Sequence, residues 1–419
     1  MTEVDAAPRR KGLGRDFGLL SSAYAIQTLG EGVMVTALPL VASMITTDPK
    51  LISWVLLAWE LPWLLLALPG GLMVDRFDRR RLMVTAQCFQ MALLVVLATA
   101  VSFEFTEMWL LYLIAFGLGA GDIIFIGASR ALLPDIVDES RLETANGRNM
   151  TAETLGRNFV GPPLGSALFT FLLPLPFWLN AVTYLLSVTL ILRIRHRALS
   201  QVTPVRREGR VLGELTAGLR WLVRHPVLRI VVMLAAVSNF CVIMGQSVLV
   251  LFAKQVLAVG DTFYGVLVAA MAVGGVVGGL FSGRAVVRFG TRTVAITVSL
   301  SSALSLLAIG ALGRQPIVVA ALFCVWSAGL ALWNVMAQSL SQRLIPDELR
   351  GRVNSASRMI CFGALPLGAL AGGLVADSIS VSAPWVIGGA LNLVVVLLTV
   401  PKLLKWPSTG VPNTEEVAS

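Results

Sequence analysis

The sequence predicts an all-α membrane protein with twelve transmembrane helices in two pseudo-symmetric six-helix halves. The chain of 419 residues is 56% hydrophobic and only 14% charged, with a mean hydropathy of +0.80. Soluble domains average about 25% charged residues. The apolar residues gather in runs of about twenty, the length that crosses a bilayer. Motifs of the first half recur in the second half, which indicates a duplicated unit.

The apolar runs define the expected spans. Six are expected in the first half, at 17–44, 50–74, 82–103, 107–132, 141–172 and 175–193. Six more are expected at 226–253, 260–286, 292–313, 315–341, 348–376 and 381–404. The expected domains are therefore an N-terminal half at 1–193, a cytoplasmic linker at 194–225, a C-terminal half at 226–404 and a disordered tail at 405–419. In the linker, LGELTAGLRWLVRHP has leucines at helical spacing and predicts a surface-lying amphipathic helix.

The charge distribution predicts how the chain lies in the membrane. A formal net charge of +9 would suggest a nucleic-acid partner in a soluble protein. Here most Lys and Arg residues fall in the N-terminal segment, alternate loops, the linker and the C-terminal end, and only Lys50, Lys254 and Arg314 fall in the opposite loops. Cytoplasmic loops carry this excess. We therefore expect a multi-pass protein of the inner (plasma) membrane, with both termini cytoplasmic, no nucleic-acid partner and a monomeric state.

No cofactor, metal site or enzymatic activity is expected. The four cysteines, Cys88, Cys241, Cys324 and Cys361, are scattered through apolar runs without a CxxC spacing, and both histidines fall in the linker. Cysteines of this kind are usually small buried residues. The sequence contains no nucleophile–base set and no phosphate-binding loop.

The stretch GGLMVDRFDRRRL, from Gly70 to Leu82, joins the second and third spans. Gly71 would let another helix approach closely, and Asp75 can accept from a helix N-terminus or from an arginine. The arginines would hold the loop in the cytosol. A plain positive-inside turn explains the arginines, but not the glycine and the acid at fixed offsets before them.

This stretch resembles the helix 2–3 signature of the major facilitator superfamily, G-x-x-x-D-R-x-G-R-K. The matching residues are Gly71, Asp75, Arg76, Arg79 and Arg80. Asp78 stands where the signature has its second glycine. The resemblance implies that Asp75 and the arginines act as a conformational latch between the halves. Family geometry further implies that Arg130, at the end of the fourth span, pairs with Asp75.

A second motif, Gly161, Pro162 and Gly165, lies in the fifth span. Proline removes backbone donors and glycine permits close packing, so the helix is expected to bend there. The motif resembles the helix 5 G-P-x-x-G motif of the superfamily's antiporters and drug exporters, which symporters mostly lack. The segments LGEG, LPDIV and IPDELRGRVNS further resemble the subfamily of siderophore and macrolide exporters.

Charged residues inside the spans are candidate binding residues, because a charge at the bilayer centre costs about 2.5–3.5 kcal/mol. Glu31 lies in the middle of the first span with Gln27 one turn before it, and Asp122 lies in the middle of the fourth. Glu153 and Arg157 are four residues apart, so we expect them to share a face and to pair. These groups would bind protons or contact a cationic substrate; alternatively, such buried pairs only fix helix packing.

In the second half, Gln246, Asn334 and Gln338 are the expected polar lining of a central cavity. The tryptophans beside Asn334 are of the kind that usually packs or forms interface belts.

Together these features predict a secondary active transporter that exports an amphipathic small molecule, such as a drug, an antibiotic or a siderophore-like metabolite. Proton antiport with alternating access is the expected mechanism. The expected partners are the substrate, protons and the lipid bilayer. Two alternatives remain open: a proton-coupled importer of a small metabolite, against which the Gly161–Pro162 motif argues, and a non-transporting membrane sensor or enzyme.

Overall fold

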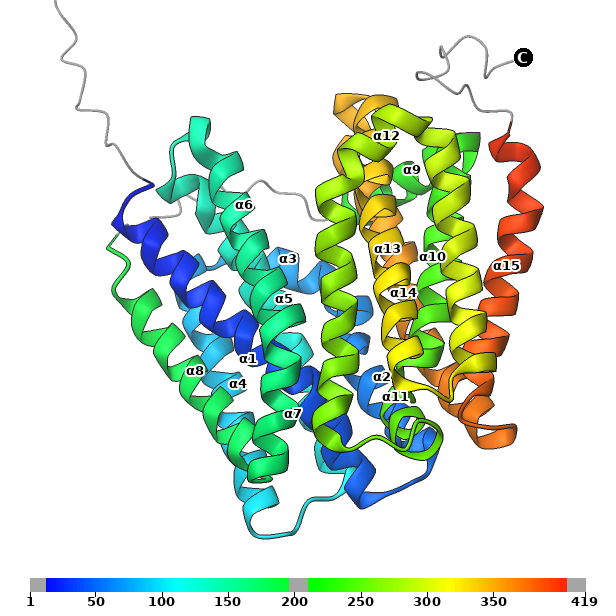
Figure 1. Ribbon diagram of the computed structural model, residues 1–419. Coiled ribbons are helices and arrows are strands. Elements are labelled where there is room, and N and C mark those ends of the chain that lie inside the picture. The colour runs from blue at the N-terminus through cyan, green and yellow to red at the C-terminus, as the bar shows by residue number, and fades with distance from the viewer. Residues whose placement is uncertain (1–12, 196–209, 405–419) are drawn as a thin grey trace, which may run out of the picture.

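The computed structural model describes residues 13–195 and 210–404, and these residues form helices and no strand (Figure 1). Nine of the described helices are long and apolar enough to cross a membrane. One of the nine, α12 (Asp261–Leu312), turns back on itself, so the path of the chain fits twelve spans. The prediction of an all-helical membrane protein is confirmed. The expected disordered tail at 405–419 and most of the expected linker before Arg210 lie outside the described residues.

The first half follows the predicted spans, with two interruptions. Its helices are α1 (Arg15–Ile45), α2 (Pro49–Leu65), α3 (Ala67–Arg76), α4 (Arg79–Ser102), α5 (Met108–Ile136), η1 (Glu139–Arg141), α6 (Leu142–Glu153), the π-helix η2 (Thr154–Val160), α7 (Gly161–Phe171) and α8 (Leu175–Leu192). The predicted span 50–74 breaks at Leu66 because Pro69 cannot donate to the Leu65 carbonyl. The span 141–172 becomes π-helical before Pro162 and Pro163, which also lack donors.

The second half begins with α9 (Arg210–Arg224) and continues through membrane-length helices. These are α10 (Pro226–Gln246), α11 (Leu249–Leu251), the π-helix η3 (Phe252–Val256), α12, α13 (Pro316–Leu344), α14 (Asp347–Ser378) and α15 (Ala383–Leu403). The two arms of α12 correspond to the predicted spans 260–286 and 292–313. They meet at Gly290, whose φ of 78° is a conformation that residues with a Cβ rarely adopt.

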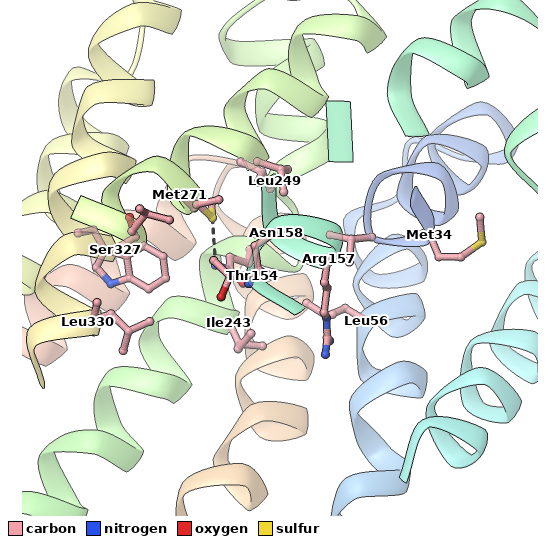
Figure 2. Close-up of a pocket in the computed structure, with 18 of the residues that line it drawn as sticks. Met34, Leu56, Thr154, Arg157, Asn158, Ile243, Leu249, Met271, Ser327 and Leu330 are labelled. Carbon is pink, nitrogen blue, oxygen red and sulfur yellow. Dashed lines mark hydrogen bonds between the residues drawn. The ribbon is translucent and has the colours of Figure 1, made fainter. Parts of the chain in front are cut away.

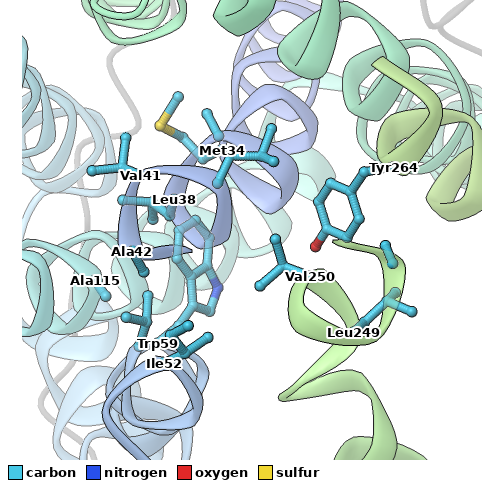
Figure 3. Close-up of a cluster of buried hydrophobic side chains, with 14 of the residues drawn as sticks. Met34, Leu38, Val41, Ala42, Ile52, Trp59, Ala115, Leu249, Val250 and Tyr264 are labelled. Atoms are coloured by element: carbon cyan, nitrogen blue, oxygen red, sulfur yellow. The ribbon is translucent and has the colours of Figure 1, made fainter. Parts of the chain in front are cut away.

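The hydrophobic cores separate the halves at one end of the molecule and join them at the other. Toward the end that carries α9, here called the α9 end, one core holds only first-half residues such as Phe17, and another holds only second-half residues such as Trp333. Away from the α9 end, a single core contains Leu38 of α1 together with Val250 of α11 and Tyr264 of α12 (Figure 3). The halves therefore pack against each other at the end opposite α9.

The amphipathic helix expected in the linker is α9, and it rests on the second half. A Cβ on Gly218 would lie 2.4 Å from the backbone oxygen of Arg352, so α9 touches the start of α14. Leu222 is buried in one cluster with Leu228 and Val353. Directly after α9, the ring of His225 stacks on Trp221 at 5.1 Å between centroids.

His225 makes the junction of α9 and α10 sensitive to pH. Its Nδ1 accepts a hydrogen bond from the backbone N–H of Leu228 at 3.4 Å and caps α10, which requires that nitrogen to be unprotonated. Burial lowers the pKa of His225 below 6.5. The neutral imidazole thus contributes stability above its ordinary pKa, and this contribution is lost as the pH falls through the lowered value.

We predict that the melting temperature of the detergent-purified protein falls between about pH 7 and pH 5. The variant His225→Asn keeps a capping side chain that does not titrate, so its melting temperature should depend less on pH in this range. Differential scanning fluorimetry of both proteins across the range measures the effect. The same pH dependence in both proteins would contradict the assignment.

Candidate functional site

A cavity of about 980 Å³ lies between the two halves and is lined by both of them. Its lining reaches Gly147 of α6 and Leu280 of α12, which lie toward the α9 end. Its other end is closed by an apolar plug formed by Met34, Leu38, Val250 and Tyr264 (Figure 3). The cavity thus opens toward the α9 end.

The charge of the cavity wall is one-sided. Among the described residues that line it, the charged ones are Glu60 of α2 and Arg157 of η2, and both belong to the first half. The second half supplies apolar groups and neutral polar ones, including Gln246 and Asn334. The amide of Gln246 donates to the Met271 sulfur at 3.7 Å (Figure 2). Such a wall suits an amphipathic molecule, with most of the contact apolar.

Glu31 and Asp122 lie behind this wall and share one amide. Gln27 Nε2 donates to Glu31 Oε1 at 2.7 Å and to Asp122 Oδ1 at 3.5 Å. Gln90 Nε2 donates to the same Asp122 oxygen at 2.8 Å. Both acids are 2% exposed, and neither lines the cavity. The sequence prediction of Gln27, Glu31 and Asp122 as one candidate group thus corresponds to three side chains that the fold brings together.

Arg157 connects this buried pair to the cavity. Its Nη1 lies 3.7 Å from Glu31 Oε2, and its side chain is 28% exposed and lines the cavity (Figure 2). The carboxylates of Glu31 and Asp122, and that of Glu60 on the cavity wall, therefore act on one guanidinium in a low-dielectric interior. Buried charges are costly unless they are balanced, so one proton on the pair would neutralise the group.

The predicted pairing of Glu153 with Arg157 is wrong. Tyr24 Oη donates to Glu153 Oε2 at 2.8 Å, while Arg157 faces Glu31. Both side chains are directed to α1, as a shared face requires, but they meet different residues there. Glu153 meets Tyr24, and Arg157 meets Glu31, which lies further along α1.

The helix 5 motif brings the backbones of α1 and α7 into contact. A Cβ on Gly161 would lie 2.5 Å from Gly32 Cα, and a Cβ on Gly32 would lie 2.6 Å from the Arg157 backbone oxygen. A Cβ on Gly165 would lie 2.4 Å from the backbone oxygen of Val33, and Thr36 Oγ1 donates to the Pro162 carbonyl at 3.0 Å. Because Gly32 follows Glu31 in the chain, this crossing sets Arg157 beside Glu31.

Two important residues were missed at the sequence level. Gln90 holds Asp122, and its signal was the pair of glutamines in the apolar stretch QCFQM. Gly32 forms the helix crossing, and its signal was a second glycine in LGEG, two residues after Gly30.

The polar residues predicted for the second half are only partly brought together. Gln246 and Asn334 line the cavity. Gln338 is exposed on α13 but does not line the cavity, because it lies one turn further toward the α9 end.

The arginines of the helix 2–3 signature bind the ends of neighbouring helices of the first half. Arg79 bonds to the Asp135 carboxylate and, at 3.0 Å, to the Ala131 carbonyl on α5. Arg80 bonds at 3.1 Å to the Ile191 carbonyl and also to the Leu192 carbonyl on α8. These bonds join α4 to α5 and α8 at the α9 end.

Other parts of the signature differ from expectation. A Cβ on Gly71 would meet no described atom within 4 Å, so the predicted close approach there is wrong. A Cβ on Gly70 would lie 3.0 Å from Ile123 Cγ2, so Gly70 is the glycine that another helix approaches closely. Asp78 accepts from the Arg81 backbone N–H at 2.8 Å and caps α4, in place of the signature's glycine. Arg76 and Arg130 are exposed. The side chain of Asp75 lies outside the described part of the structure, as does its predicted pairing with Arg130.

Polar contacts join the halves at the end opposite α9. Lys50 at the start of α2 pairs with Asp377 near the end of α14 at 2.6 Å. The hydroxyls of Thr170 and Thr262 lie 3.2 Å apart. Together with the apolar plug, these contacts close the cavity on that side.

The sequence profile of the transmembrane secretion effectors, a family of the major facilitator superfamily, matches residues 9–415. The chain belongs to this family. Its members are transporters, not enzymes, and the chain is accordingly a multi-pass membrane transporter.

Relatives include the uncharacterized transporter YfiS of Bacillus subtilis, 25% identical with 91% of each chain covered. The multidrug efflux pump Tap of Mycolicibacterium fortuitum is 26% identical, with 88% of this chain and 91% of Tap covered. Macrolide efflux protein A of Streptococcus pyogenes is 20% identical, with 91% of this chain and 94% of that protein covered.

Solved transporters share the fold of this family member. The nucleoside transporter NupG superposes with a TM-score of 0.76 at 13% identity, covering 93% of this chain and all of NupG. A bacterial homologue of the iron transporter ferroportin, in an inward-facing state, superposes with a TM-score of 0.71 at 19% identity. The match covers 95% of this chain and all of that homologue. At these identities the likeness supports the fold alone.

We predict that the Lys50–Asp377 pair helps to keep the cavity closed at its plugged end. In a cysteine-free background with Val250→Cys, the change Lys50→Asp should speed labelling by a membrane-impermeant thiol reagent. An increase of about two- to fivefold is expected, because solvent screens an exposed ion pair and leaves it only a small contribution to the closed state.

The double variant Lys50→Asp/Asp377→Lys should restore slow labelling. A matched control is Lys254→Asp, since Lys254 pairs with Asp261 within the second half at 2.9 Å and should not affect the closure. Equal labelling rates in the Lys50→Asp variant and its parent would show that the pair does not hold the halves together.

Proposed function

We propose that the protein exports an amphipathic small molecule, such as a drug, an antibiotic or a siderophore-like metabolite, by proton antiport with alternating access. The observation that carries the proposal is the buried Glu31–Asp122 pair, which faces a single guanidinium at the wall of the central cavity. Such a group can hold one proton or none, and its net charge changes by one unit each time. Intramembrane acids of this kind act in proton-coupled transport.

The open end of the cavity is proposed to face the cytoplasm. Arg79, Arg80 and most other cationic loop residues lie toward the α9 end, and cytoplasmic loops are the ones enriched in Lys and Arg. Both termini and α9 then lie in the cytoplasm. A cavity open to this side can load a molecule from inside the cell, and rocking of the halves about the plugged end would release it outside.

In the proposed cycle, loss of the proton to the cytoplasm leaves the Glu31–Asp122–Arg157 group with one net negative charge. This charge favours a cationic amphipathic substrate at the wall beside Glu60 and Arg157. After the cavity reorients, a proton from outside neutralises the group and the substrate is released. Gln27 and Gln90 hold the acids, while Gln246 and Asn334 offer neutral hydrogen-bonding groups to the substrate.

The names of two relatives support export over import, because Tap is an efflux pump for multiple drugs and the streptococcal relative exports macrolides. The remaining assignments belong to the same proposal: a latch at Asp75, Arg76, Arg79 and Arg80, a six-helix half on each side of the linker, and a monomeric transporter.

Transport can be tested in inverted membrane vesicles, whose outer face is the cytoplasmic one. The panel contains ethidium, erythromycin and a catecholate siderophore, supplied with an imposed pH gradient. Accumulation that collapses with a protonophore is the expected result. Uptake of a probe into right-side-out vesicles or cells, driven by the opposite gradient, would instead indicate a proton-coupled importer.

We predict that Glu31→Gln and Asp122→Asn each lower gradient-driven accumulation by roughly tenfold or more, since each removes a carboxyl that holds the exchanged proton. Both substitutions keep the size of the side chain and one of its two acceptor oxygens. Glu143→Gln, at an exposed acid early in α6, should leave accumulation unchanged. Unaltered gradient-driven transport by both variants, at normal amounts in the membrane, would refute the assignment.

A further inference from the structure

A buried glutamine of the first half lacks any protein partner for its side chain. Gln87 on α4 is fully buried, and neither its Oε1 nor its Nε2 makes a hydrogen bond to the protein. Gln27 Oε1 and Gln90 Oε1 are also buried without a protein partner. A primary amide can donate two hydrogen bonds and accept two, and leaving them all unmade inside a membrane protein is costly. Side chains in this state usually bond to buried water.

Gln87 lies on the same face of α4 as Gln90, three residues earlier and nearer the α9 end. Gln90 in turn donates to Asp122. The two glutamines therefore form a short row of buried amides beside the acid pair, with Gln87 on the side of the α9 end.

The depth of Gln87 follows from the pairing of α4 with α8. Arg80 of α4 bonds to the Ile191 carbonyl of α8, and the two helices pack against each other and run in opposite directions. Seven residues further along α4 is Gln87, and seven residues back along α8 is Tyr184, each about 10 Å deeper into the membrane. Tyr184 is 1% exposed, and neither residue lines the central cavity. Gln87 and Tyr184 thus lie at a similar depth inside the first half, apart from the cavity.

We propose that Gln87 holds a chain of buried waters that carries protons between the Glu31–Asp122 pair and the α9 end, separately from the substrate cavity. The transfer is a relay: the protonated carboxyl gives its proton to a bonded water, which passes one of its own protons to the next water. No other bond is made or broken. Gln87 is a positioning residue in this relay, since its amide orients the waters and does not itself change charge.

This inference rests on the proposed proton antiport and adds to it a proton route that is separate from the substrate cavity. Among the described residues, Arg157 both pairs with Glu31 and lines the cavity, and its positive charge repels a hydrated proton on that side. A second route through the interior of the first half avoids that guanidinium. A proton can then leave toward the α9 end while a substrate occupies the cavity.

The first test compares coupled transport with substrate exchange in vesicles, using erythromycin and ethidium as probes. Gln87→Met keeps the side-chain length and removes the amide. It should lower gradient-driven accumulation by about tenfold, while exchange of probe at equal pH, which needs no proton release, should stay within about twofold. Gln87→Asn, which retains an amide, should recover part of the coupled rate.

The matched control is Asn392→Leu. Asn392 on α15 is 2% exposed and leaves its Nδ2 without a protein partner, but it belongs to the other half. This variant should not lower gradient-driven accumulation relative to probe exchange. If Gln87→Met lowers both rates equally, its role is structural and the inference is wrong. Loss of coupling in Glu31→Gln together with normal coupling in Gln87→Met would refute the water path and leave the proposed antiport intact.

A second test needs no substrate. X-ray hydroxyl-radical footprinting of the purified protein oxidises side chains that lie beside bound water. Tyr184, which is almost inaccessible to bulk solvent, should be oxidised in the wild type and protected in Gln87→Met. Absence of oxidation at Tyr184 and on the segment around Gln87 in the wild type would show that this interior is dry.

Discussion

The close crossing of α1 with the segment from Gly156 to Gly161 determines the geometry of the site. Gly32 has no room for a Cβ against the Arg157 and Gly156 carbonyls, and Gly161 has none against Gly32. Small residues of this kind let helices in a membrane approach until their backbones touch. Since Arg157 and Glu31 lie next to these contact points in the chain, the crossing fixes their distance. A larger residue at the crossing would separate the Arg157 guanidinium from the buried acids.

The contacts between the two halves differ between the two ends of the molecule. At the plugged end, Leu38, Val250 and Tyr264 share one core, so the halves are joined by burial of apolar surface. At the α9 end, each half keeps its own core, and the arginines of the helix 2–3 signature bond within the first half. Most of the contacts at the open end thus lie within one half, although Trp63 beside the first-half core also meets Phe362 of α14 at 5.9 Å between ring centroids.

Most of the fold and part of the site could be predicted from the sequence. Spans of about twenty apolar residues leave few alternatives to helices, since the bilayer offers the backbone no hydrogen bonds. Buried charge likewise marked Glu31, Asp122 and Arg157. The pairing of Glu153 with Tyr24 could not be foreseen, because spacing along one helix does not show which residues of α1 lie opposite it. Gln87 and Gln90 carry no charge, so hydropathy alone gave them little weight. Gly71 matches the family signature, but spacing does not show that Gly70 is the glycine that meets α5.

The one-sided charge of the cavity wall has a consequence for how such a chain can diverge. Glu60 and Arg157 belong to the first half, whereas the wall supplied by α10, α12 and α13 is uncharged. Substitutions of the cavity-lining residues in the second half therefore reshape the surface that contacts the substrate. They do not alter the two charged residues of the wall. Mutations in the first half act on the charged groups and leave most of that surface as it was. The shape of the cavity and its charge are thus set by residues in different parts of the chain, so one can change without the other.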